Sequence, residues 1–167
     1  MDFDSPQVKR SVLALRHLDF ELAYLALLTR EGLKPLSRWE KPLADDTLEL
    51  LRELGLLSRR IIRTVKTGRE VTETVFSVSP GYLELYEKRF GGRPIEKSAA
   101  AVRLEGFLFG FPPCCVDRFI RRPYAKNGLD PERQKILFHW ACNGCKITPL
   151  LWPAYNAIHD YLVADVE

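Results

Sequence analysis

The sequence predicts an α+β fold, mostly helical: a domain of three helices and a β-hairpin in residues 1–92, then a small all-helical cysteine-cluster domain in residues 93–167. Three observations lead to this prediction. Apolar residues recur every three to four positions through most of the chain, which is the spacing of amphipathic helices. Two neighbouring runs rich in β-prone residues flank a glycine. The segment "GGRP" is typical of a linker, and all four cysteines come after it.

Three helical elements are expected before the hairpin. The first covers residues 11–30, where leucines recur at helical spacing, and Gly32 ends it. The second is a short element in residues 35–43, broken by Pro42.

The third helix is expected over residues 47–54. Asp46 precedes it and Glu49 follows three residues later, which is the arrangement of a capping box. Gly55 supplies the left-handed residue that commonly follows a helix.

The hairpin is expected from residues 57–65 and 71–78, because Gly68 lies in the connection between them and permits a tight turn. Residues 80–90 predict a further helix. This order, three helices followed by a hairpin and a further helix, is similar to that of a winged helix-turn-helix domain over roughly residues 8–90. The resemblance rests on the order of the elements.

The charge pattern argues against base reading by this domain. Winged helices often place their third helix in the major groove of DNA, but here that helix exposes four carboxylates, which repel phosphates. The hairpin is basic, with Arg59, Arg60, Arg63, Lys66 and Arg69. These side chains are either a solvated face or a weak, sequence-indifferent contact with nucleic acid. Without such binding, the domain is expected to bind a protein partner or to self-associate.

The second half predicts helices without strands. Residues 99–109 form an apolar helix candidate, and Pro112 and Pro113 can open the next helix, since proline costs little in a first turn. A third helix is expected over residues 129–139, capped by Asp130. "ACNGCK" is then a loop, and a last helix starts near residue 148.

The cysteines and one histidine predict a metal site. Cys142 and Cys145 have the spacing of a metal knuckle, with Gly144 for the turn, and His139 precedes them by three residues. Cys114 or Cys115 supplies the fourth ligand of a zinc site. With residues 116, 119 and 120 on the buried face, Cys115 lies about 100° from residue 116 and Cys114 about 200°. Cys115 is therefore expected as the inward ligand and Cys114 as the spare.

The same residues are consistent with several alternatives. All four cysteines suit an iron–sulfur cluster. Few Gln and Asn residues and a single Met indicate a thermophile, and intracellular disulfides do occur in hyperthermophiles. Cys115 at a helix start, with His139 as base, would suit a thiol-dependent enzyme. Buried inert thiols are a fourth possibility.

The segments "FGFPPCCVDRF" and "HWACNGCKITPLL" are similar to the motif of a mainly archaeal family designated domain of unknown function 483. The similarity covers about residues 105–155 and singles out Pro112 or Pro113, Cys114, Cys115, Phe119, His139, Cys142 and Cys145. It implies that the thiol cluster is the functional centre, and it implies no activity.

Composition sets the remaining expectations. Hydrophobic residues make up 46% of the chain and charged residues 28%, an ordinary globular balance. No apolar run approaches a membrane span, and the first residues lack the core of a secretory signal. A cytoplasmic protein is expected, with a zinc-dependent regulator or adaptor as the leading function and a disulfide-stabilised interaction protein among the alternatives.

Overall fold

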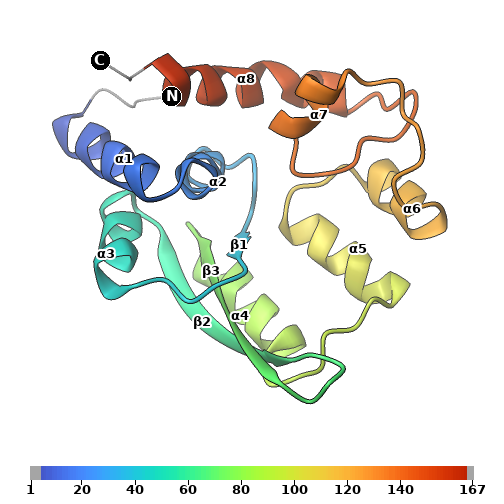
Figure 1. Cartoon of the computed structure of the whole chain (residues 1–167), viewed down its shortest axis with the longest axis horizontal. Coiled ribbons are helices and arrows are strands. Elements are labelled where there is room, and N and C mark those ends of the chain that lie inside the picture. The colour runs from blue at the N-terminus through green and yellow to red at the C-terminus, as the bar shows by residue number, and fades with distance from the viewer. Residues whose placement is uncertain (1–4, 165–167) are drawn as a thin grey trace. The chain divides into compact units, whose positions relative to one another are not determined.

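The computed structural model describes residues 5–164 and shows an α+β chain that is mostly helical. This part of the chain contains eight helices and one three-stranded sheet. The chain divides into two compact units, Met1–Glu96 and Lys97–Glu167, which we call the N-terminal unit and the C-terminal unit. The sheet lies wholly in the N-terminal unit (Figure 1). The predicted α+β class is thus confirmed.

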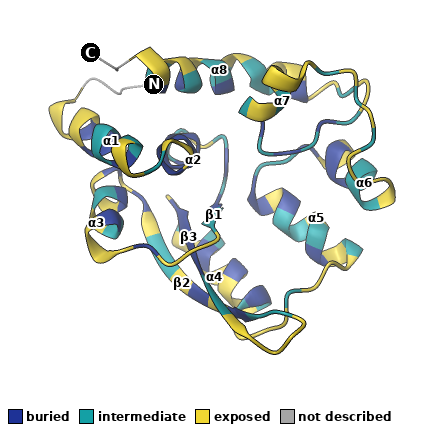
Figure 2. Cartoon of the chain, viewed as in Figure 1, coloured by how far each residue is buried: buried dark blue, intermediate teal, exposed yellow. Residues whose placement is uncertain are grey.

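The N-terminal unit builds helices around an antiparallel sheet. Its elements are α1 (Pro6–Leu18), α2 (Phe20–Arg30), β1 (Ser37–Trp39), α3 (Asp45–Glu53), β2 (Leu57–Thr64), β3 (Glu70–Ser77) and α4 (Pro80–Phe90). The strand order is β1–β3–β2, so β3 is central. Gly68, with a φ of 81°, makes the predicted turn of the hairpin. Helix α2 contacts β1 and β3, and every residue from Leu22 to Thr29 is buried (Figure 2).

The single helix predicted over residues 11–30 is two helices. Asp19 has an extended backbone, with a φ of −164°, and its carboxylate accepts hydrogen bonds from the backbone N–H groups of Glu21 and Leu22. An aspartate in this position satisfies the first free donors of a new helix. The leucine spacing continues across the break, which is why periodicity alone did not show it.

Two further predictions in this unit differ from the structure. The short element of residues 35–43 contains an edge strand rather than a helix, because Ser37 to Trp39 pair with the central strand β3, Ser37 opposite Phe76. The capping box at Asp46 does not form, because the helix begins at Asp45, two residues before the predicted start, and the methyl side chain of its N-cap, Ala44, cannot accept a hydrogen bond. Gly55 does adopt the predicted left-handed conformation, with a φ of 78°.

The predicted linker at residues 91–94 is attached to the sheet. Gly92 donates to the carbonyl of Ile62, Thr64 donates to the carbonyl of Arg93, and Ile95 donates to the carbonyl of Thr64. These bonds satisfy backbone groups along the outer side of β2, which a free linker would leave to water. The N-terminal unit accordingly extends to Glu96, beyond the boundary expected at residue 92.

The C-terminal unit is helical in the part that the structure describes. Its elements are α5 (Ala99–Leu108), α6 (Pro113–Arg121), α7 (Pro131–Ile136) and α8 (Thr148–Ala164). Helices α5 and α6 touch at Gly106, where an added Cβ would lie 2.5 Å from a methyl group of Val116. Helix α7 contacts α8. None of the helices in residues 5–164 is long and apolar enough to span a membrane.

Candidate metal centre

The first turn of α6 presents two adjacent cysteines. Pro113 occupies the first helical position, and the carbonyl of Pro112 accepts hydrogen bonds from the N–H groups of Cys115 and Val116. Proline suits this position because its fixed φ matches the helix and its missing N–H would have no partner there. Cys115 is 1% exposed, as the predicted helix face required, and Cys114 is exposed.

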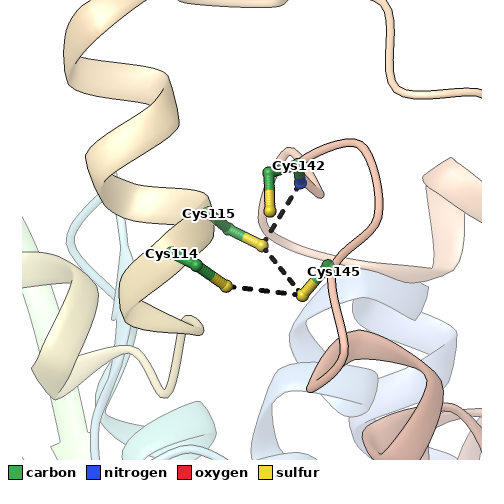
Figure 3. A group of neighbouring side chains, drawn as sticks. All are labelled: Cys114, Cys115, Cys142 and Cys145. Atoms are coloured by element: carbon green, nitrogen blue, oxygen red, sulfur yellow. Dashed lines mark hydrogen bonds between the residues drawn. The ribbon is translucent and has the colours of Figure 1, made fainter.

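The other two cysteines lie on the loop before α8. The N–H of Cys145 donates to the carbonyl of Cys142 at 3.2 Å, which closes a tight turn. Gly144 has a φ of 70°, a conformation that strains residues with a Cβ. The turn brings both thiols to the same side of the loop, where they face the start of α6 (Figure 3).

The four sulfur atoms converge, and all lie within 4.8 Å of one another. The Sγ of Cys145 is 3.5 Å from the Sγ of Cys114 and 3.5 Å from that of Cys115 (Figure 3). A tetrahedral Zn²⁺ with Zn–S bonds of about 2.3 Å would separate its sulfur ligands by about 3.8 Å. All four thiols are free, and their separations far exceed the roughly 2.05 Å of a disulfide bond.

Backbone and hydroxyl donors surround the sulfurs. The N–H of Cys142 donates to the Sγ of Cys115 at 3.3 Å. Thr148 donates twice to the Sγ of Cys145, from its N–H at 3.3 Å and from its hydroxyl at 3.2 Å. Donors of this kind stabilise thiolates, which are the form that binds metal.

The thiols differ in acidity for identifiable reasons. Although partial burial by itself raises the pKa of Cys145, hydrogen bonds from Thr148 and from the backbone of Ile147 outweigh it and lower that pKa to about 6. Cys114 is exposed as a residue, but partial desolvation of its thiol, followed by hydrogen bonding to Cys145, raises its pKa to about 11. Burial also raises the pKa of Cys115. Cys145 is therefore the most acidic of these three thiols, and a metal that binds here must displace protons from Cys114 and Cys115.

His139, expected as the nitrogen ligand, lies beside the cluster. Helix α7 ends at Ile136, so His139 is on the segment that follows rather than on the helix. Its Nε2 is 3.0 Å from the hydroxyl of Thr148. Because that hydroxyl gives its proton to Cys145, it accepts from Nε2–H, and the histidine supports the cluster through Thr148. Among the described residues, the converging group contains Cys114, the expected spare, in place of His139.

Sequence reasoning missed Thr148. It lies three residues after Cys145, at the first position of α8, and is buried. A threonine in the turn that joins a cysteine pair to a helix is a usable signal, because its N–H and hydroxyl can both reach the preceding thiolate.

Replacing Thr148 with valine tests this support. Thr148→Val removes the hydroxyl donor and keeps the backbone donor, so zinc affinity should fall roughly 10- to 100-fold, as for other groups that hold a metal ligand. The measurement is competition for zinc against a chromophoric chelator. Ile147→Val is the matched control, because that neighbouring side chain is exposed and carries no donor. Equal affinities in the two variants would show that the hydroxyl does not support the thiolate.

The five basic side chains of the hairpin do not form one free surface. Arg63 is 1% exposed and donates to the hydroxyl of Tyr86, so it is unavailable for the nucleic-acid contact that the sequence suggested. The reason is the register of β2, which turns Arg63 toward α4. The other hairpin side chains are arranged as follows: Arg59 pairs with Glu87, Arg60 pairs with Asp45 at 2.7 Å, and Lys66 and Arg69 are exposed.

Comparison of the chain with models of known protein families, with curated proteins and with solved structures finds no match.

Proposed function

We propose that the C-terminal unit is a structural zinc module in which Cys114, Cys115, Cys142 and Cys145 hold one Zn²⁺. The observation that carries the proposal is the convergence of the four sulfurs within 4.8 Å. Thiolates are soft ligands that select zinc among the common divalent cations, and four of them complete a tetrahedral site.

The sulfur spacing favours a single ion over an iron–sulfur cluster. A cluster distributes its cysteine ligands over separate irons, which holds their sulfurs farther apart than ligands of one ion. Here the Sγ of Cys145 has two sulfur neighbours at 3.5 Å. Adjacent cysteines at a helix start can share one ion more readily than they can reach two irons.

A closed set of four protein ligands supports a structural role. Catalytic zinc sites keep a position open for water or substrate. We therefore propose a regulator or adaptor, with the N-terminal unit as the winged-helix-like module. Three helices and a hairpin support that layout, although β1 comes between α2 and α3.

The acidic first turn of α3 supports a protein partner, or a second copy of the chain, over DNA. Membership of the family designated domain of unknown function 483 remains part of this proposal.

Metal analysis of protein purified without oxygen tests the zinc site. We expect about one equivalent of zinc per chain and a colourless protein, and Cys145→Ser should purify without zinc. Lys146→Ala, an exposed change in the same loop, should keep the full equivalent. Stoichiometric iron with a brown colour would establish a cluster instead, and a metal-free protein without titratable thiols would establish disulfides.

A thiol-dependent enzyme is the second candidate, favoured by the pKa of about 6 at Cys145. A thiolate at neutral pH with the Cys115 sulfur 3.5 Å away has the components of a redox pair. This function requires a folded, metal-free protein in which Cys145 is alkylated first and rapidly at neutral pH. Bound zinc would instead protect all four thiols, so alkylation followed by peptide mapping separates the two functions.

A further inference from the structure

The last turn of α6 and the start of the connection to α7 are strongly basic. Residues 118–126 read "RFIRRPYAK" and contain four cations and no carboxylate: Arg118, Arg121, Arg122 and Lys126. Three of these side chains are exposed and Arg118 is half-buried. Asp117, the nearest carboxylate before the segment, pairs with Arg103 at 2.9 Å. Within residues 5–164, no ion pair to a carboxylate neutralises the four cations.

An exposed aromatic ring stands in the middle of this segment. Tyr124 is 69% exposed, and its φ of 55° is the single positive value outside glycine in the described chain. Non-glycine residues adopt this conformation at a cost, and they keep it where the surroundings impose it.

Two rings hold Tyr124 in place. Phe119 meets it edge to face with ring centroids 5.2 Å apart, and Trp140 does the same at 5.5 Å. The indole N–H of Trp140 donates to the carbonyl of Ala125 at 2.8 Å, which ties the segment to the loop that carries Cys142. The tyrosine is thus positioned by contacts on its inner side, and its outer side is open to solvent.

We propose that this surface, formed by Arg118, Arg121, Arg122, Tyr124 and Lys126, binds single-stranded nucleic acid. The cations neutralise backbone phosphates, and the Tyr124 ring stacks on one base. Proteins that bind single strands combine a basic track with an aromatic platform in this way. A duplex offers no unstacked base to a ring held in one position, so the surface prefers single strands. The inference is independent of the zinc proposal and moves the nucleic-acid contact from the hairpin to the C-terminal unit.

Fluorescence anisotropy of the full chain with labelled oligouridylate and oligothymidylate tests the inference. Tyr124→Ala should weaken binding roughly 5- to 150-fold, the loss expected for one stacked base, and Tyr124→Phe should keep affinity because stacking needs no hydroxyl. Arg122→Ala with Lys126→Ala should weaken binding and reduce the salt slope by about 1.4, for two lost phosphate contacts on a single strand. Zinc content and melting temperature of each variant are measured beside affinity.

The matched control is Lys66→Ala with Arg69→Ala, which removes the same charge from the exposed hairpin turn and should leave affinity unchanged. The proposal is overturned if Tyr124→Ala binds as the unchanged protein does, or if the hairpin variant loses as much affinity as the Arg122/Lys126 variant. Binding to a matched duplex as tight as to single strands would also overturn it. Binding to phosphatidylserine vesicles together with no binding to oligonucleotides would overturn the proposal as well.

Discussion

Replacing Cys114 with serine should release zinc and unfold the C-terminal unit. A domain of about 70 residues rarely obtains more than about 3–5 kcal/mol from its core, whereas a structural zinc contributes on the order of 10 kcal/mol. Loss of one of four thiolates should lower zinc affinity by more than the roughly 100-fold that a lost supporting hydrogen bond costs. The structure makes Cys114 a member of the converging group, so its exposure does not make it dispensable.

Hydrogen exchange read by peptide is the appropriate measurement. Cys114→Ser and Cys115→Ser should both lose protection in α5 and α6, and the chelator-treated protein should match them. Protection in α2 and β3 should remain, because those elements have their own buried core. Lys146→Ala serves again as the control. Full protection and a full zinc equivalent in Cys114→Ser would return this cysteine to the role of a spare and reopen the question of His139 as a ligand.

Replacing Arg63 with alanine should destabilise the N-terminal unit by about 3–5 kcal/mol, the usual effect of removing one partner of a buried charged pair. Arg63 and Glu73 are both buried, with the guanidinium 3.7 Å from the carboxylate. The hydroxyl of Tyr86 joins them: it accepts from Arg63 at 3.4 Å and donates to Glu73 at 2.6 Å. The guanidinium also stacks 4.9 Å from the ring centre of Phe90. Alanine would leave Glu73 buried with Arg38, 3.8 Å away, as its remaining cationic neighbour.

Urea unfolding of matched variants measures the effect. Arg60→Ala removes an exposed ion pair from the same strand and should cost no more than about 1 kcal/mol. The double variant Arg63→Met with Glu73→Leu should recover most of the loss, since replacing both members of a buried pair with apolar residues is often neutral. Equal losses in the Arg63 and Arg60 variants would show that the buried network contributes little to stability.

Local signals in the sequence were sufficient for several elements. Pro80 opens α4 at the predicted residue, and Pro113 does the same for α6. Gly68 makes the predicted turn, and Asp130 caps α7 by accepting from the N–H of Glu132. Each of these signals acts through backbone geometry or a hydrogen bond within a few residues, so no distant contact is needed to interpret it.

The three-residue strand β1 could not be predicted in the same way. Its pairing partner in β3 lies far along the chain, and three residues carry too little periodicity to indicate a strand. The burial of Arg63 has a similar cause. A strand turns alternate residues to opposite faces, and only the packing of α4 decides which face is inside.

The sequence by itself placed the candidate metal site in two short motifs, because these motifs contain all four cysteines of the chain. Tertiary structure decided how those motifs meet. Helix α7 ends before His139, and the Cys142–Cys145 turn lies across the start of α6, so Cys114 joins the converging sulfurs and His139 bonds to Thr148. Which residues can bind one metal ion here depends on distances of a few ångströms between segments about 30 residues apart. Helix packing sets these distances, and spacing along the chain does not.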